Sequence, residues 1–417
     1  MVYKEIRLGN IFSFCYGKMP ESNNLVHEGK TGFPIYTGYR FVGLYNKYMY
    51  EEPKLIVVAR GVGGTGDVKI APSKTWITNL SIIFNSKTNT SDMKYLLYFF
   101  RVYNLRFLDT GSAQSQITSG DLQRLKILLP PLRIQKKIAA ILSAYDDLIE
   151  NNNRRIAILE KMADELYREW FVRLRFPGYE KVKIVKGVPA GWEVKKLGEL
   201  VNYYIGGGWG EENNSLNHPI GAYVIRGTDI PKLSSGNFIK EVFRYHKESN
   251  YKSRKLIEGD IIFEVSGGSK GQLLGRTLLI TNELLRYFDN KVICASFCKL
   301  IRVSNTLCSP FFLKYFFKNY YDTEMVGTYQ IQSTGISNYQ FEDLLKYQKL
   351  VIPIHEVIDE FENKVKPMLI SKDKISLVNN NLKLSRDRLL SRLMSGKIDV
   401  EKMAIAFPKS MEKEASA

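Results

Sequence analysis

The sequence predicts an α+β fold in which two pseudo-repeated globular domains are joined by two long helices that form an antiparallel coiled coil. Three observations predict this fold: an ordered internal repeat, a heptad stripe of apolar residues at the end of each copy, and a linker rich in glycine and proline between the copies. The length of 417 residues also exceeds what one ordinary hydrophobic core accommodates, which favours at least two domains.

The internal repeat consists of four matches whose separation grows along the chain. The stretch LGNIFSFCYG from Leu8 reappears as LGELVNYYIG from Leu197, at an offset of 189. Three further matches follow in the same order at offsets of 206, 223 and 228, namely LIVVARG with IIFEVSGG, LKILLP with QKLVIP, and the NNN run at 151–153 with that at 379–381. A preserved order with growing offsets is expected when the second copy carries longer loops. Each half is therefore predicted to run from a strand-rich segment through a proline into a long helix.

Two stripes at heptad spacing predict the long helices. The first comprises Ile138, Leu142, Tyr145, Ile149, Asn152, Ile156, Leu159, Ala163, Leu166 and Trp170. The second comprises Phe361, Met368, Ile375, Leu382 and Leu389, backed by Val365 and Leu393. Such stripes with charged flanks indicate coiled-coil pairing. A helix of about 43 residues extends roughly 60 Å, more than one small domain covers, so the simplest partner for each helix is the other. Asn152 lies on the apolar seam, where it either fixes the register or marks a local break.

These patterns divide the chain into six segments. The linker RFPGYEKVKIVKGVPAGWEV separates the two copies. The predicted segments are a first globular domain at 1–131, a long helix at 132–175, the linker at 176–190, a second globular domain at 191–353, a second long helix at 354–400 and a C-terminal tail at 401–417.

The glycine-rich stretch ARGVGGTGDVKI follows the apolar run KLIVV and carries Gly61, Gly63 and Gly66 at the spacing of a dinucleotide-binding loop. A dinucleotide site also needs a helix after the third glycine and an acidic residue about 20 positions later. Here the glycines lead into alternating apolar and polar residues, and the later segment NLSIIFNSKTN offers Asn85 but no carboxylate. The pattern favours a β-hairpin or a strand-loop-strand unit over a cofactor site.

The formal net charge of +17 favours a polyanionic partner, either nucleic acid or an anionic membrane surface. A membrane is disfavoured because no apolar run approaches the roughly 20 residues that span a bilayer, and the N-terminal MVYKEIRLGN has no signal-peptide core. The cysteines are Cys15, Cys294, Cys298 and Cys308. We interpret them as reduced packing residues of a cytoplasmic protein; the alternative is a zinc site at Cys294 and Cys298, which strand periodicity places on one face.

Several motifs carry a resemblance to a known family. The first is GSAQSQITSGDLQRLKILLPPLRIQKKIAAILSAYDDLIENNNRRIAILEKMADELYREWF. Its counterpart in the second half is STGISNYQFEDLLKYQKLVIPIHEVIDEF with VNNNLKLSRDRLLSRLMSGKI, and the two glycine loops add to both. With the repeat order, these motifs make almost the whole chain resemble the specificity subunits of type I restriction-modification systems. VIPIHEV departs from the pattern because it lacks the doubled proline and the following glutamine. This departure affects how the second helix begins and not the overall architecture.

The resemblance implies a protein without catalysis of its own. Two target-recognition domains would each read half of a split double-stranded DNA site through the major groove. The paired helices would act as a spacer and dock two methyltransferase (modification) subunits, and motor-nuclease (restriction) subunits would complete a complex that cuts DNA. No cofactor is then expected on this chain, and S-adenosylmethionine, ATP and Mg²⁺ are expected on the partner subunits.

The residues agree with a chain that is not an enzyme. Neither an Asn/Asp-Pro-Pro-aromatic tetrapeptide, typical of adenine methylation, nor an ATP-binding G-x-x-x-x-G-K-[ST] motif occurs. The cluster GDIIFEVSGG carries Asp260 and Glu264 without a lysine two positions after Glu264, which favours a strand with a charged edge over a nuclease site. YLLYFF and FFLKYFFKNYY are predicted to be amphipathic core helices; the alternative is that their aromatic rings stack on bases.

The candidate DNA-reading residues cluster in turns of both halves. Arginine can bind guanine, and glutamine or asparagine can bind adenine, each through two hydrogen bonds. The first-half candidates are Thr37, Tyr39, Arg40, Arg60, Gly63, Gly64, Gln114, Ser115 and Gln116. The second-half candidates, expected at matching places, are Arg226, Thr228, Asp229, Ser266, Ser269, Lys270, Gln272, Gln330 and Gln332. For each, the alternative is a solvated loop side chain.

Two other classes of function stay open at this point. One is a self-contained restriction nuclease or methyltransferase-like enzyme, which would act on DNA without partner subunits. The other is a coiled-coil adaptor whose globular halves bind protein, which would have no DNA sequence preference.

Overall fold

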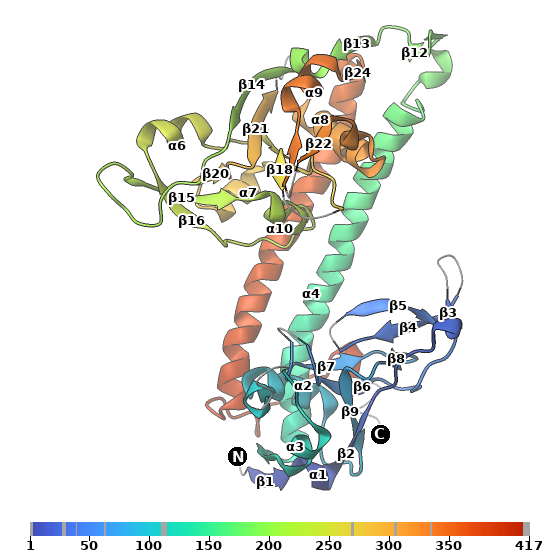
Figure 1. Ribbon diagram of the computed structural model, residues 1–417, viewed down its shortest axis with the longest axis vertical. Helices are drawn as coiled ribbons and strands as arrows, with labels where there is room; N and C mark the ends of the chain where they lie inside the picture. Colours follow the sequence, from blue (N-terminus) through green and yellow to red (C-terminus); the bar gives the residue numbers. More distant parts are fainter. Residues whose placement is uncertain are drawn as a thin grey trace. The chain divides into compact units, whose positions relative to one another are not determined.

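The computed structural model describes residues 3–26, 31–38, 40–61, 64–109, 115–267, 271–303, 307–333 and 336–411. The chain forms two compact units (Figure 1). The first unit comprises Met1–Ile149 with Leu382–Ala417, and the second comprises Glu150–Asn381. Each unit thus holds one globular domain and part of each long helix. The division predicted from the sequence places its boundaries at the ends of the long helices, whereas the compact units divide each helix between them. The predicted segment boundaries stay a prediction.

The first domain is built on two four-stranded sheets. The main sheet is antiparallel, in the order β2 (Phe12–Tyr16), β9 (Ser81–Ser86), β6 (Lys54–Val58), β7 (Val68–Ala71). The second sheet has the order β3 (Leu25–Val26), β5 (Phe41–Tyr45), β4 (Phe33–Tyr36), β8 (Trp76–Ile77), with β4 and β8 parallel. A separate pair joins β1 (Lys4–Arg7) to β10 (Lys126–Leu129).

The strand β6 explains why KLIVV is almost continuously apolar. Successive side chains of a strand point to opposite faces of its sheet. Leu55 and Val57 enter the main core of the domain, whereas Ile56 enters a smaller cluster with Ile77 and Ile83. Both faces of this central strand are therefore buried. The antiparallel pairing of β6 with β7 confirms that the glycine-rich stretch closes a β-hairpin.

The second domain repeats this arrangement. Its main sheet has the order β14 (Val201–Gly206), β21 (Cys298–Val303), β17 (Ile261–Glu264), β19 (Thr277–Leu279). Its second sheet has the order β16 (Phe243–His246), β15 (Ile220–Ile225), β20 (Val292–Cys294), with β15 and β20 parallel. The remaining strands are β13 (Glu193–Lys196) paired with β24 (Lys349–Ile352), β11 (Ile184–Val185) with β12 (Val188–Pro189), and the sheet β18 (Ser266–Gly267), β23 (Ile336–Tyr339), β22 (Gln330–Ser333).

Equivalent backbone hydrogen bonds confirm the internal repeat. The Leu8 amide donates to the Leu125 carbonyl at 2.8 Å, and the Leu197 amide donates to the Gln348 carbonyl at 2.8 Å. At the other end of the main sheet, two further bonds correspond: Ile117 N–H to Ala59 O at 3.0 Å, and Tyr339 N–H to Val265 O at 2.9 Å. The offsets between these partners rise in chain order, as the sequence matches predict.

Short helices complete both domains. They are α1 (Leu8–Ile11), α2 (Met93–Val102), α3 (Ser119–Arg124), α5 (Ile230–Ser234), α6 (Glu248–Arg254), α7 (Asn282–Tyr287), α8 (Pro310–Asp322) and α9 (Phe341–Tyr347). Asp92 caps α2 by accepting the Tyr95 amide at 2.7 Å, and Ser309 caps α8 by accepting the Phe311 amide at 3.1 Å. Such side-chain acceptors satisfy backbone donors that a helix leaves free at its start.

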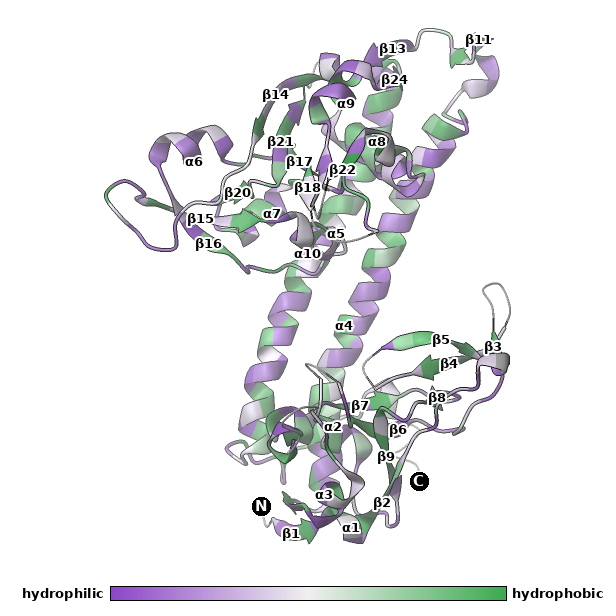
Figure 2. Cartoon of the chain, in the orientation of Figure 1, coloured by the Kyte–Doolittle hydropathy of each residue, from purple (hydrophilic) through white to green (hydrophobic). Residues whose placement is uncertain are grey.

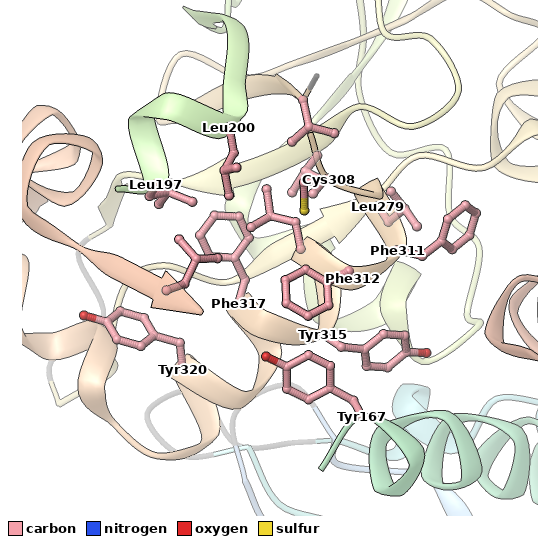
Figure 3. Close-up of a cluster of buried hydrophobic side chains, with 14 of the residues drawn as sticks. Tyr167, Leu197, Leu200, Leu279, Cys308, Phe311, Phe312, Tyr315, Phe317 and Tyr320 are labelled. Atoms are coloured by element: carbon pink, nitrogen blue, oxygen red, sulfur yellow. The ribbon is translucent and has the colours of Figure 1, made fainter. Parts of the chain in front are cut away.

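The aromatic residues of α2 and α8 pack in the cores, as predicted. Tyr95 and Tyr98 are buried in the first domain. In the second, Figure 3 shows Phe312 and Tyr315 beside Tyr167, with ring centroids 5.8 and 6.2 Å from the Tyr167 ring. Aromatic packing of this kind adds to the free energy gained by burying the rings.

The two long helices are α4 (Leu132–Tyr167), which continues into a π-helical segment (Arg168–Val172), and α10 (His355–Met394). The predicted stripe of α4 is confirmed, since each of its ten residues is buried or half-buried. In the second unit, Asn152 of α4 contacts Asn379 of α10, and Glu160 contacts Lys372. Because the residue numbers rise along α4 while they fall along α10, the paired segments are antiparallel. In the first unit Arg386 binds Asp146 at 2.5 Å.

The predicted stripe of α10 is also buried or half-buried throughout, but in its middle other residues of the helix are buried more deeply. Phe361 and Val365 are buried as expected, but Met368, Ile375 and Leu382 are only half-buried. The buried residues there are Leu369, Lys372, Asp373, Ser376 and Asn379. This part of α10 packs against loops of the second domain as well as against α4, so heptad spacing alone does not determine which side chains are covered.

Apolar and polar residues alternate along both long helices (Figure 2). Among the described helices, none combines the length and apolar character needed to cross a membrane.

The cysteine interpretation needs one correction. Cys294 ends β20 and Cys298 begins β21, so they lie on strands of different sheets rather than on one face of a single strand. Both are buried as free thiols, and burial raises the pKa of the Cys294 thiol to about 12. Within the described ranges, no three histidine, cysteine or acidic side chains gather as metal ligands do.

Candidate nucleic-acid interface

Three segments of the first domain meet where β6 ends. Gly38 packs there, because a Cβ placed on it would lie 3.1 Å from the Val58 side chain. Directly after β6, Arg60 forms a β-bridge with Gln116, which brings in the third segment. Arg60 is exposed and Gln116 is half-exposed. The structure thus brings together residues that the sequence places far apart.

The remaining first-domain candidates support these segments. The Thr37 hydroxyl donates to the Arg40 carbonyl at 3.3 Å, closing the turn. Ser115 and the Gln116 amide both donate to Asp109, the latter at 2.8 Å. Gly64 accepts the Asp67 amide within the hairpin loop. Three sequence candidates, Tyr39, Gly63 and Gln114, lie outside the described residues.

The third glycine of the hairpin has a structural role. Gly66 has φ +91°, and a Cβ there would lie 2.8 Å from the Arg106 backbone nitrogen. Its amide donates to Val58 O, just as the Gly275 amide donates to Glu264 O in the second domain. Gly275 has φ +93°, and a Cβ on it would overlap the Val326 side chain. The two halves therefore share a closely packed position that only glycine can occupy, because a Cβ there would overlap neighbouring atoms.

In the second domain, the turn after β15 presents Arg226 and Thr228. Arg226 Nε binds Asp229 Oδ2 at 3.0 Å, and its Nη2 also contacts Glu241. These carboxylates raise the pKa of the guanidinium through hydrogen bonds and charge. Asp229 is 4% exposed and accepts the Arg226 amide at 2.9 Å. It therefore orients the arginine, while Thr228 is the exposed member of the turn.

A cavity of about 480 Å³ brings four second-domain candidates together: Arg226, Thr228, Ser266 and Gln272. Its wall also contains Trp209 and Phe297, which are 43% and 58% exposed. Sequence reasoning missed these two aromatic residues, because no spacing distinguishes them from core aromatics. Ser269 and Lys270 lie outside the described residues.

The two glutamines of TYQIQSTG do not match their expected counterparts. Gln330 Oε1 accepts the Leu274 amide at 2.9 Å, an internal role, and Gln332 is exposed on β22. The residue equivalent to Gln116 is Asn338, because Ser266 pairs with Asn338 as Arg60 pairs with Gln116. Asn338 Oδ1 accepts the Ser266 hydroxyl at 2.9 Å. The growing repeat offset was the signal that could have identified Asn338.

The expectation of a charged strand edge in GDIIFEVSGG is wrong. Asp260 is 0% exposed and directly precedes β17, and Glu264 is 2% exposed at the end of β17, a strand inside the main sheet. Arg302 Nε binds Asp260 at 2.7 Å, and Arg276 Nε binds Glu264 at 2.7 Å. A buried carboxylate needs such a partner because burial alone disfavours its charge. Both carboxylates are thus held in internal ion pairs.

Comparison with known proteins places this arrangement in a family. The family described as "Type I restriction modification DNA specificity domain" matches residues 2–161. The chain is 28% identical to the type I restriction enzyme MjaIX specificity subunit of Methanocaldococcus jannaschii over 326 residues, which are 74% of this chain and 70% of that protein. It is 30% identical over 126 residues to the C-terminal part of a putative type I specificity subunit of Mycoplasma pneumoniae, covering 29% of this chain and 83% of that one.

The fold is also known from a crystal structure. The type I restriction-modification system S subunit from M. genitalium superposes with a TM-score of 0.61 at 18% identity, covering 94% of this chain and 96% of that one. Together with the sequence matches, the repeated domains and paired helices lead to one conclusion. The chain belongs to the family of type I restriction-modification DNA specificity subunits.

Proposed function

We propose that each globular domain reads one half of a bipartite double-stranded DNA site through the major groove, and that the chain itself carries out no catalysis. The coiled coil sets the gap between the half-sites and docks two methyltransferase subunits, with motor-nuclease subunits completing the complex. S-adenosylmethionine, ATP and Mg²⁺ bind to those partner subunits, and this chain binds neither a cofactor nor a membrane.

One observation carries the proposal: the two domains hold different side chains on the same backbone framework. The equivalent pairs are Arg60 with Gln116 in the first domain and Ser266 with Asn338 in the second. Base edges in the major groove are distinguished by such donors and acceptors. Different side chains at equivalent backbone positions are expected of two domains that recognise two different half-sites.

The net charge of +17 supports a DNA partner. Lysine and arginine contacts to phosphates release counterions, so affinity falls steeply as salt concentration rises. We expect a steep linear decrease of log affinity with log salt concentration for duplex DNA. A binding constant independent of salt would contradict an electrostatic interface.

Exposed apolar residues on the long helices support the docking of partner subunits. In the second unit, Ile158 and Met162 of α4 are 57% and 51% exposed, and Val378 of α10 is 50% exposed. Exposed apolar surface often marks a site of protein association. Ile158→Glu is expected to weaken co-purification of methyltransferase subunits, while a charge change at exposed Lys161 leaves it intact.

The central test is a change in the DNA gap. A preferred site is first selected from random duplex DNA, and one base pair is then inserted between its halves. The insertion rotates one half-site by roughly 35° and shifts it by about 3.4 Å, so specific affinity is expected to fall at least roughly tenfold. Unchanged affinity would exclude a rigid spacer, and the absence of any preferred sequence would favour the adaptor function.

A second assay separates this proposal from an autonomous enzyme. The purified chain is incubated with DNA, Mg²⁺, ATP and S-adenosylmethionine in the absence of other subunits. No cleavage and no methylation are expected. Either activity would overturn the proposal that the catalytic groups lie on partner subunits.

A further inference from the structure

A polar face of α10 holds a loop of the second domain. Lys372 and Asn380 are eight residues apart, so they lie on one face of the helix, two turns from each other. Lys372 Nζ donates to the Ser234 carbonyl at 2.7 Å, and Asn380 Nδ2 donates to the Phe238 carbonyl at 3.2 Å. The loop 234–238 is thus bound to α10 at both of its ends.

The middle of the same loop packs directly on the same face. Ser376, halfway between the two donors, is 0% exposed. Gly236 lies against it so closely that a Cβ would overlap the Ser376 hydroxyl, and its φ is +78°. We call Lys372, Ser376 and Asn380 the polar stripe. Its three contacts follow the loop in order, which indicates a built attachment rather than a single chance hydrogen bond.

The charge at the start of the stripe is buried and paired. Lys372 is 5% exposed and lies 3.4 Å from Glu160 and 3.5 Å from Asp373. Asp373 in turn accepts the Thr281 hydroxyl at 2.5 Å. A buried ammonium group is stable only when its partners are held in place, so these contacts favour one geometry of the loop.

The loop is the direct continuation of the DNA-reading turn. The turn that presents Arg226 and Thr228 leads into α5 (Ile230–Ser234), and Lys372 binds the carbonyl of the last residue of α5. Carbonyls at a helix C-terminus lack intrahelical partners and favour a cation. A helix of five residues is only about 7.5 Å long, so the turn lies close to its attachment.

The first domain lacks this connection at the equivalent place. After the turn 37–40 the chain enters β5 (Phe41–Tyr45) directly, without a helix that leads to either long helix. Attachment of a reading turn to the coil is therefore particular to the second domain within the described residues.

We propose that the polar stripe positions the DNA-reading turn of the second domain on α10, so that the second half-site is accepted at one spacing only. Lys372 is a positioning residue, since it acts on DNA through Ser234 and α5. This inference rests on the proposed reading of a bipartite site and names the contact that makes the gap strict.

The test compares gap selectivity between variants of the full chain, in complex with whatever subunits co-purify. Affinities are measured for the preferred site and for the site with one base pair inserted. Lys372→Met is expected to reduce the ratio of the two affinities roughly tenfold, which corresponds to about 1.4 kcal/mol of lost discrimination. Lys372→Arg, which keeps the cation, should retain most of the ratio. Lys374→Met is the matched control, because Lys374 is exposed on the same helix.

Asn380→Ala gives a second, milder route to the same result if circular dichroism finds Lys372→Met unfolded. It releases the other end of the loop and should also relax the gap preference. A strict gap in the wild type together with an equally strict gap in the folded variants overturns the inference. A wild type without any gap preference instead overturns the proposed rigid spacer, and the inference with it.

Discussion

Replacing Asn379 with leucine is expected to destabilise the paired helices of the second unit. Asn152 Nδ2 donates to Asn379 Oδ1 at 2.8 Å, and Asn379 Nδ2 donates to Asn153 Oδ1 at 3.0 Å. Asn152 is 9% exposed and Asn379 is 2% exposed. The pair is therefore a buried contact between α4 and α10, which agrees with a register-fixing asparagine rather than a break in the seam.

The magnitude follows from what each variant leaves behind. In Asn379→Leu, the Asn152 amide stays buried without its acceptor, which costs about 1–3 kcal/mol of unfolding free energy. Asn152→Leu leaves Asn379 Oδ1 buried without its donor, while Asn379 Nδ2 keeps its bond to Asn153. When both residues are leucine, no buried amide is left unpaired, so the double variant should be far less destabilised than the sum of the single variants. We expect a coupling energy of about 0.5–3 kcal/mol between the two positions.

Amide hydrogen exchange of the segments around these residues is the appropriate assay, because it reports local opening free energy in a protein with two units. Asn151→Leu is the matched control, since Asn151 is exposed on the neighbouring position of α4. The control should change local protection little. Additive effects of the two seam substitutions, with no coupling, would refute the argument that the buried amides depend on each other.

Three further predictions concern the globular domains. Gly66→Ala should lower the free energy of unfolding by about 1–3 kcal/mol, because φ is +91° and a Cβ there meets backbone atoms. Gly178→Ala should lower it less, because Gly178 has φ +80° but open space around its Cβ position. Urea unfolding measures both variants. Arg276→Met leaves the carboxylate of Glu264 buried without its cation and should cost about 3–5 kcal/mol by the same assay. Burial lowers the pKa of His246 below its ordinary 6.5. As the pH falls below 6.5, the unfolded chain therefore binds more protons than the folded one, and the free energy of unfolding should decrease. His246→Phe should reduce this pH dependence, which urea titrations at several pH values measure.

Each of these predictions has a clear contrary result. Equal costs for the two glycine substitutions would mean that steric contact at Gly66 contributes nothing. A small effect of Arg276→Met would indicate that Glu264 becomes protonated or hydrated at little cost. An unchanged acid dependence after His246→Phe would assign it to other groups.

The repeated fold was largely predictable because its signals are one-dimensional. The stripe from Ile138 to Trp170 depends only on the helical period, and α4 begins at Leu132, the first residue of the predicted helix. The match of Leu8 with Leu197 reflects equivalent backbone hydrogen bonds at the first turn of each domain. Both the period and the repeat can be recognised along the sequence without knowing which distant segments contact each other.

The candidate site was predictable only in part, because strand pairing decides which residues meet. Arg226, Thr228, Ser266 and Gln272 do line one cavity, although they come from separate segments. The partner of Ser266 could not be identified by residue type alone. It is Asn338 on β23, whereas the glutamines of TYQIQSTG lie on the neighbouring strand β22.

The sequence by itself determined the two-copy organisation, the long paired helices and the family. The tertiary structure alone decided that Asp260 and Glu264 are internal ion pairs and that α10 buries Lys372 in place of an apolar seam residue. The physical reason is that burial and charge pairing depend on neighbours contributed by distant segments. Periodicity describes one helix or strand at a time, whereas a buried lysine is explained only by the carbonyl and carboxylates that surround it.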